Sequence, residues 1–132
     1  GPTAQRIVSG LPSSRRRQLA RVSSLAESGT ETAVRWWLES LHVPVTPQVV
    51  VPGVGRVDLK LGQNWIIECD SVQFHDNPRQ YHLDRARDLQ LQARRYTVTR
   101  LTWEQVFLDW ERTSELLLTI LRRREHRRPL AS

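Results

Sequence analysis

Hydrophobic and polar residues alternate from Arg56 to Leu61 and, less cleanly, from Trp65 to Asp70. The three residues between these segments, Gly-Gln-Asn, are turn formers. Alternation with a period of two is typical of β-strands whose two faces have different surroundings. The pattern therefore predicts a β-hairpin, with Val57, Leu59 and Leu61 on one face of its first strand.

Further helices and strands are predicted on both sides of this hairpin. Helical spacing of apolar residues indicates helices over about residues 13–27, 28–42 and 79–94 and in two segments after Thr102, and β-branched segments indicate strands over residues 45–51 and 96–101. Prolines in the first of these strands favour the edge of the sheet. The order predicts an α/β fold, in which an antiparallel three-strand meander and one parallel strand form a mixed sheet flanked by helices.

The length and composition predict one folded domain. The chain has 132 residues, 39% of them hydrophobic, and five tryptophans, enough for a core. We expect residues 28–125 to form this domain, after an arginine-rich helical extension over residues 1–27 and before a disordered or solvated basic tail over residues 126–132. Gly1-Pro2 resembles a protease-cleavage scar, so we expect a longer natural chain with a further N-terminal domain.

Cysteine usage and hydropathy predict a cytoplasmic protein. The single cysteine, Cys69, excludes an internal disulfide framework and fits a reducing compartment. The sequence contains no apolar run long enough for a transmembrane helix and no signal-peptide core near Gly1. A zinc site using Cys69 and a histidine would need four ligands at recognisable spacing, and the sequence lacks them.

The charge of the chain points to a polyanionic partner. The net charge is +6, and arginine supplies nearly all of the positive charge because Lys60 is the only lysine. The planar guanidinium group suits phosphate recognition, so nucleic acid is the expected partner. The alternative is that a GC-rich genome raises the arginine content everywhere.

The hairpin carries acidic residues where strand pairing would bring them together. With a three-residue turn, Leu61 pairs with Trp65, and Asp58 then lies opposite Glu68. A two-residue turn would shift the register and place Asp58 opposite an apolar residue. Opposed carboxylates repel each other, and a hard divalent cation such as Mg²⁺ would explain them. A solvated face, screened by the neighbouring basic side chains, is the alternative.

Three further groups extend this acidic region. Asp70 shares a face with Glu68 and joins the predicted carboxylate cluster. His75 follows in a loop; its pKa near neutral suits a general base, although a surface histidine is the alternative. The next predicted helix is densely charged, which also fits a salt-bridged surface, and its residues Leu83, Ala86, Leu89 and Ala93 are expected to face the sheet.

The order of the motifs resembles a known superfamily. The matching pieces are SGTE before a helix, RVD on a strand, IIECDS followed by FH, DRARD on the next helix, and YTVTRLT. Together they resemble the restriction-endonuclease-like (PD-(D/E)XK) superfamily, in its Vsr-like branch, and more closely a family of small bacterial Vsr-related domains. That family commonly reads EVDG where this chain reads ECDS. The resemblance covers about residues 28–107.

The resemblance implies roles for individual residues. Asp58 matches the central metal-binding aspartate, and Glu68 occupies the acidic position of the next strand. Asp70 stands where the motif lysine would be, which puts the usual lysine role in doubt. His75 matches a histidine that assists catalysis, and Glu31 matches an acidic residue that helps to bind metal, although capping of the first helix is its local interpretation.

The resemblance also implies a function. It indicates a restriction-endonuclease-like fold and a Mg²⁺- or Mn²⁺-dependent endodeoxyribonuclease, including a nicking enzyme, that acts on DNA in repair or defence. The predicted nucleic-acid contacts are Arg87, Arg85, Arg56 and Lys60. The alternative is a non-catalytic nucleic-acid-binding or regulatory module, associated with toxin–antitoxin systems, on the same fold. The oligomeric state stays open.

Overall fold

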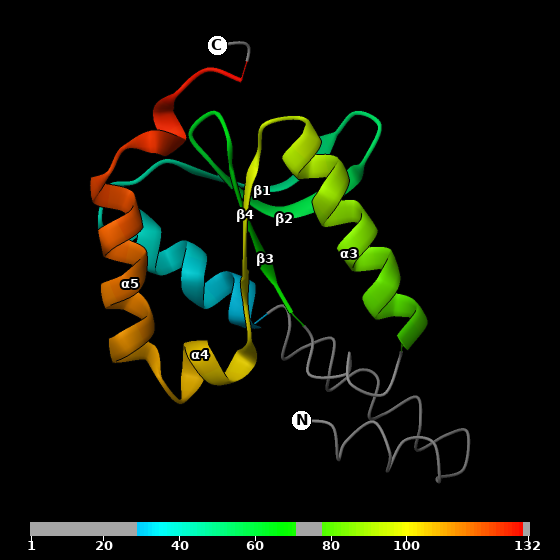
Figure 1. Cartoon of the computed structure of the whole chain (residues 1–132). Helices are drawn as coiled ribbons and strands as arrows, with labels where there is room; N and C mark the ends of the chain where they lie inside the picture. Colours follow the sequence, from blue (N-terminus) through cyan, green and yellow to red (C-terminus); the bar gives the residue numbers. More distant parts are fainter. Residues whose placement is uncertain (1–28, 71–77, 131–132) are drawn as a thin grey trace, which may run out of the picture.

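The computed structural model describes residues 29–70 and 78–130. Its centre is a four-stranded sheet in the order β1 (Val45–Val51), β2 (Gly55–Leu61), β3 (Trp65–Cys69) and β4 (Thr97–Leu101). The first three strands form an antiparallel meander, and β4 runs parallel to β3 (Figure 1). The predicted mixed α/β fold is confirmed, as is the edge position of β1.

Helices cover both faces of this sheet. They comprise residues 29–40, α3 (Pro78–Ala93), α4 (Trp103–Phe107), α5 (Trp110–Arg122) and the 3₁₀ turn η2 (Glu125–Arg127). α3 lies on one face, and the helix at residues 29–40 lies on the other with α4 and α5 (Figure 1). None of these helices is long and apolar enough to cross a membrane. The predicted helix at residues 13–27, Ser28 and His75 lie outside the described residues.

The two faces of the sheet bury unequal cores. The face under residues 29–40, α4 and α5 holds ten buried apolar residues: Val34, Leu38, Leu59, Leu61, Trp65, Ile67, Leu101, Val106, Leu117 and Leu121. The face under α3 holds four: Val51, Val57, Ile66 and Leu91. Apolar burial is the main stabilising term in folding, so the first face carries most of the stability.

The apolar side chains of β2 switch from one face of the sheet to the other at Asp58. Val57 packs in the core under α3, whereas Leu59 and Leu61 pack in the other core. The prediction that these three residues share a face is wrong. β1 changes face at the same level, where Gln48 adopts the left-handed conformation with φ of 53° and interrupts regular β-geometry.

α3 presents charge rather than its leucines to the sheet. Leu83 and Leu89 are exposed, as are the alanines of the helix, whereas Asp84 and Leu91 are buried. The prediction that Leu83, Ala86, Leu89 and Ala93 face the sheet is therefore wrong. Charged partners on β3 and β4 hold the polar side of α3 inward, as the ion pairs below show.

The basic tail is folded as far as the structure describes it. η2 lies against the β2–β3 turn, where the backbone N–H of Gln63 donates to the carbonyl of His126 over 2.7 Å. His126 is buried and its ring lies 6.0 Å from that of Trp65. The expectation of a disordered end is wrong for residues 126–130, although the arginine side chains of this segment are exposed, as a solvated end requires.

Candidate functional site

The hairpin register brings Asp58 and Glu68 together. β2 and β3 are joined by a three-residue turn, with Leu61 opposite Trp65 and the regular pairing ending at Leu59 opposite Ile67. The next position along the two strands is Asp58 opposite Glu68. Of the two turn lengths considered from the sequence, the three-residue turn is the one observed.

Each carboxylate of this pair binds the backbone of the opposite strand. The backbone N–H of Asp58 donates to Glu68 Oε2 over 3.0 Å, and the backbone N–H of Cys69 donates to Asp58 Oδ2 over 2.8 Å. These bonds replace the ladder at the point where regular pairing stops. We call Asp58 and Glu68 the carboxylate pair; its geometry is fixed by the sheet itself.

The surroundings of Glu68 disfavour the ionised form of its carboxyl group. Its side chain is only 6% exposed. Burial, and next the adjacent Asp58 carboxylate, raise the pKa of Glu68 to about 8. Arg87 of α3 opposes this shift, since its Nη2 lies 2.7 Å from Glu68 Oε1 and also donates to the carbonyl of Arg56. Near neutral pH the Glu68 carboxyl group therefore carries a proton in most molecules.

A second ion-pair group continues from Asp70. Arg100 of β4 lies 2.7 Å from a carboxylate oxygen of Asp70 and 2.7 Å from one of Asp88 on α3. Burial raises the pKa of Asp70, and the Arg100 guanidinium opposes that rise. Asp88 also forms an ion pair with Arg85, whose Nη2 lies 3.2 Å from Asp88 Oδ2. These contacts place Asp70 beside an arginine.

The sequence reasoning missed Arg100 as a residue of this region. A signal was present, because Arg100 shares a face with Tyr96 and Val98 in the predicted strand. The parallel register that sets Arg100 opposite Glu68 depends on the crossover through α3, and local sequence does not specify it.

Glu31, on the helix at residues 29–40, is bonded to Gln48 of β1. Both of its carboxylate oxygens accept from Gln48 Nε2, over 3.0 and 2.9 Å. Gln48 falls between the pairs Pro47–Leu59 and Val49–Val57, which places it opposite Asp58. Gln48 was also missed, because it is the partner of a helix residue 17 positions away.

The predicted three-carboxylate metal set is therefore only partly assembled. Among residues 29–70 and 78–130, no three histidine, cysteine, aspartate or glutamate side chains come together as a group that could hold a metal ion. Asp58 and Glu68 are adjacent, whereas Glu31 is bonded to Gln48. A pair is nevertheless sufficient for Mg²⁺, which usually takes one or two carboxylates together with water and phosphate oxygens. The donor set thus fits a hard divalent cation.

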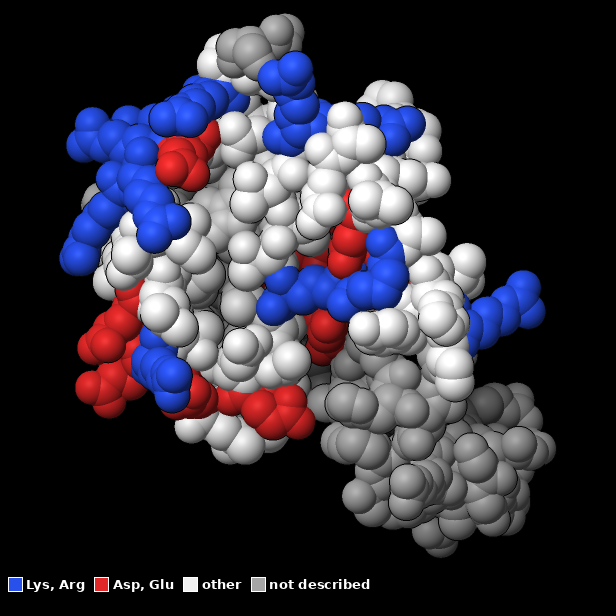
Figure 2. All heavy atoms as spheres, in the orientation of Figure 1, with Lys and Arg blue, Asp and Glu red and all other residues white. Residues whose placement is uncertain are grey.

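The predicted nucleic-acid contacts lie on β2 and α3. Arg56 and Arg85 are exposed, and Lys60 lies 5.9 Å above the ring of Tyr96. Arg87 is partly exposed and bonded to Glu68. Figure 2 shows basic and acidic atoms meeting between β4 and α3. The charged region is thus open to solvent on at least one side.

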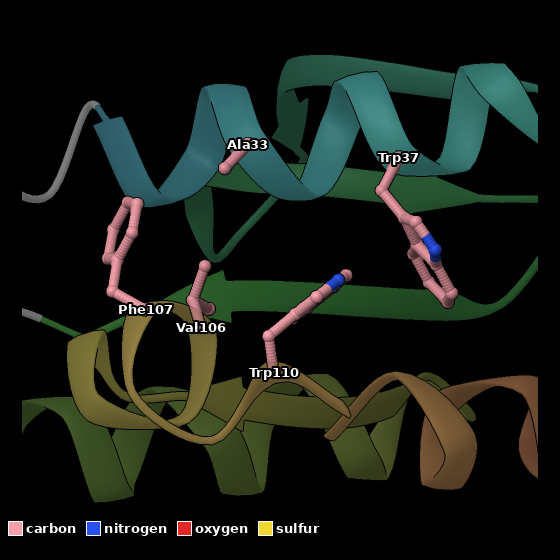
Figure 3. Close-up of a pocket in the computed structure, with 5 residues that line it drawn as sticks. All are labelled: Ala33, Trp37, Val106, Phe107 and Trp110. Atoms are coloured by element: carbon pink, nitrogen blue, oxygen red, sulfur yellow. The ribbon is translucent and has the colours of Figure 1, made fainter. Parts of the chain in front are cut away.

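A hollow with apolar walls lies elsewhere in the molecule. It has a volume of about 140 Å³ and is lined by Ala33, Trp37, Val106, Phe107 and Trp110 (Figure 3). The two tryptophan rings meet edge to face at 5.0 Å. The hollow contains no carboxylate or basic side chain, so it offers no chemistry comparable with that of the carboxylate pair.

Comparison with known proteins adds evidence on the fold. No protein-family model matches the chain, and no curated protein sequence matches it. Among solved structures, the "Homing Endonuclease I-Bth0305I Catalytic Domain" superposes with a TM-score of 0.56 and 18% sequence identity, over 67% of this chain and 89% of that one. The chain is therefore similar in fold to the catalytic domain of a homing endonuclease.

Proposed function

We propose that this chain is a divalent-metal-dependent endodeoxyribonuclease of the restriction-endonuclease-like superfamily, related to its Vsr-like branch. The observation that carries the proposal is the carboxylate pair, locked across a hairpin that stops pairing at that level. The fold it shares with a homing endonuclease catalytic domain supports the same chemistry. Phosphodiester hydrolysis, by nicking or double-strand cutting, in DNA repair or defence, is the reaction class we assign.

Asp58 and Glu68 would hold the Mg²⁺ or Mn²⁺ ion, with Glu31 as a further ligand through water. When bound, such a cation supplies a water of lowered pKa and positive charge beside the phosphate. Glu68 must lose its proton to serve as a ligand, because carboxylates bind metal in the ionised form. Arg87 lies 2.7 Å from Glu68 and is partly exposed, so it would be placed to contact a phosphate oxygen beside the carboxylate pair.

The remaining residues position the substrate and move the proton. His75 is the proposed group that accepts or relays the proton of the attacking water, on the ground of its motif position. Arg100 holds Asp70 in place, so Asp70 and Arg100 together occupy the region of the absent motif lysine. Arg56, Lys60, Arg85 and Arg87 would contact the DNA backbone, a role that gives register without reading sequence.

Cleavage of supercoiled plasmid tests the proposal directly. The wild-type protein is incubated with Mg²⁺, Mn²⁺ or EDTA, with Asp58→Ala beside it. We expect metal-dependent conversion to open-circular or linear DNA that is absent with EDTA and absent in the variant, and the form produced separates nicking from double-strand cutting. Equal cleavage by a folded Asp58→Ala protein would overturn the assignment of the carboxylate pair.

A non-catalytic nucleic-acid-binding module is the second candidate. It is favoured by the arginines, since Arg87 and Arg100 already lie 2.7 Å from carboxyl oxygens of Glu68 and Asp70. Titration with Mn²⁺ separates the two, because a binding module retards intact plasmid without taking up a cation, whereas the nuclease binds Mn²⁺ at the carboxylate pair.

A further inference from the structure

Five exposed arginines gather at the end of α5 and on η2. We call them the arginine surface: Arg122, Arg123, Arg124, Arg127 and Arg128. They form the basic area over η2 and the end of α5 at the upper left of Figure 2, whereas acidic atoms gather below them over α4 and the beginning of α5. Glu125 is the one acidic residue in the segment 122–128. The surface therefore carries a concentrated positive charge.

The backbone beneath the arginine surface is fixed to the β2–β3 turn. Asn64 Nδ2 donates to the carbonyls of Glu125 and Arg128 over 2.9 and 3.2 Å. A Cβ atom on Gly62 would lie 2.3 Å from the carbonyl oxygen of His126, so the turn and η2 are in direct contact. A fixed backbone loses less conformational freedom on binding than a free tail does. The charges are thus presented in a set arrangement.

Nothing within the described chain neutralises these charges. Arg85, Arg87 and Arg100 form ion pairs with carboxylates within residues 29–70 and 78–130, and none of these pairs reaches the arginine surface. The dipole of α5 favours a cation in its last turn, which accounts for Arg122. Arg127 and Arg128 lie beyond that turn and gain little from it. Interactions among the described residues thus do not account for most of the positive charge on this surface.

We propose that the arginine surface is a second contact with the phosphate backbone of duplex DNA, outside the carboxylate pair and its neighbouring basic residues. The inference rests on the proposed function for the identity of the polyanion as DNA. Planar guanidinium groups bind phosphate oxygens in pairs. The acidic residues of α4 and the first half of α5, which include Glu104, Asp109 and Glu111, repel a duplex and so direct it towards η2.

The spacing between the two regions suits a duplex. Glu68 lies four residues along β3 from Asn64, which touches η2. At roughly 3.3 Å per strand residue this is about 13 Å. Successive phosphates along one DNA strand advance about 3.4 Å. A duplex outside the sheet whose axis is parallel to β3, with its cut phosphate at the carboxylate pair, therefore meets the arginine surface about four base pairs away.

Salt-dependent binding of a fluorescent 30-base-pair duplex in EDTA tests this contact without cleavage. The proteins compared are the wild type, Arg127→Gln/Arg128→Gln, and Arg112→Gln, which removes the same kind of charge from the acidic part of α5. Each phosphate contact contributes roughly 0.9 to the slope of log K against log salt. We expect the double variant to lower that slope by about 1.8 and to weaken binding at low salt, with Arg112→Gln unchanged and all melting temperatures alike.

The outcomes separate this contact from the nuclease assignment. A wild-type slope and affinity in the double variant, or equal losses in Arg112→Gln, would overturn the second contact even if the wild type cleaves plasmid. Wild-type protein that fails to bind the duplex would overturn it as well. The expected loss in the double variant, together with absence of metal-dependent cleavage, would support the arginine surface and reject the nuclease. In an active enzyme, the double variant should raise KM at constant kcat.

Discussion

The two faces of the sheet bury different kinds of side chain. The face under residues 29–40, α4 and α5 is filled with apolar side chains from the sheet and from these three helices. The face under α3 has a smaller apolar group and, beside it, the charged residues Glu68, Arg87 and Arg100. A buried charge destabilises a fold unless it is paired. The first face thus stabilises the domain through apolar burial, whereas the second face has fewer apolar contacts and holds paired charged groups.

The hairpin belongs to both faces at once. β2 and β3 contribute Leu59, Leu61 and Ile67 to the apolar side, while the same two strands hold the carboxylate pair where their pairing stops. A site built on such strands is positioned by the core behind it rather than by a loop. Substitutions on the two faces should consequently separate stability from activity.

The largest effect should come from Glu68→Gln, which breaks the charged face without breaking the fold. Glutamine keeps the shape of the protonated side chain, so the melting temperature at pH 7 should equal or exceed that of the wild type. It cannot supply the anionic ligand, and we expect the rate of plasmid cleavage to fall by at least roughly a hundredfold, the scale for losing one electrostatic group at a reacting centre. A parallel loss of folding would instead make Glu68 a structural residue.

Leu38→Ala and Leu89→Ala compare the apolar core with the solvent side of α3 through the same substitution. Leu38 is fully buried in the apolar core, whereas Leu89 on α3 is 67% exposed. Urea unfolding should show a loss of roughly 2–5 kcal/mol for Leu38→Ala and within about 0.5 kcal/mol of wild type for Leu89→Ala. Similar losses in both would mean that α3 is covered by something that the described residues do not include.

Arg100→Gln against Arg85→Gln sharpens the role of charge under α3. Both arginines pair with Asp88, but Arg100 is 14% exposed and also pairs with Asp70, whereas Arg85 is 41% exposed. Removing Arg100 leaves two poorly solvated carboxylates, and we expect a loss of roughly 2–3 kcal/mol in the free energy of unfolding. Arg85→Gln should lose less than about 1 kcal/mol. Equal losses would contradict the buried-network interpretation.

A smaller effect should appear in the dependence of stability on pH. The pKa of Glu68 is raised from 4.5 to about 8 in the folded chain, so the folded state keeps a proton that the unfolded state releases. Stability contributed by this proton is full below about pH 4.5 and is lost as pH rises through about 8. The raised pKa of Asp70 acts in the same direction.

Without added metal, we expect the free energy of unfolding of the wild type to fall by about 1–2 kcal/mol between about pH 6 and 8, since one linked proton contributes at most about 1.4 kcal/mol per pH unit. Glu68→Gln should show a flatter profile over the same range, and Mn²⁺ should oppose the loss in the wild type alone. Identical profiles for the two proteins would show that Glu68 titrates normally.

Local patterns predicted most of the fold because the decisive signals are local. Alternation and turn residues located the hairpin but left two turn lengths open, and the three-residue turn is the one that sets Asp58 opposite Glu68. α4 begins at a capping box formed by Thr102 and Gln105, which are only three residues apart. Which side of α3 faces the sheet was predicted wrongly, because ion pairs with distant strands outweighed its leucines. Arg100 and Gln48 meet their partners through the tertiary fold, which short-range patterns do not contain.

Manganese binding followed by electron paramagnetic resonance at about pH 8.5, above the pKa of Glu68, tests the central claim most directly. The proteins are the wild type, Asp58→Asn, Glu68→Gln and, as a control acid outside the pair, Asp109→Asn. We predict one bound Mn²⁺ per chain in the wild type and in Asp109→Asn, and loss of this binding in both variants of the carboxylate pair. A wild type that binds no Mn²⁺, or an Asp58→Asn protein that binds it as the wild type does, would contradict the account.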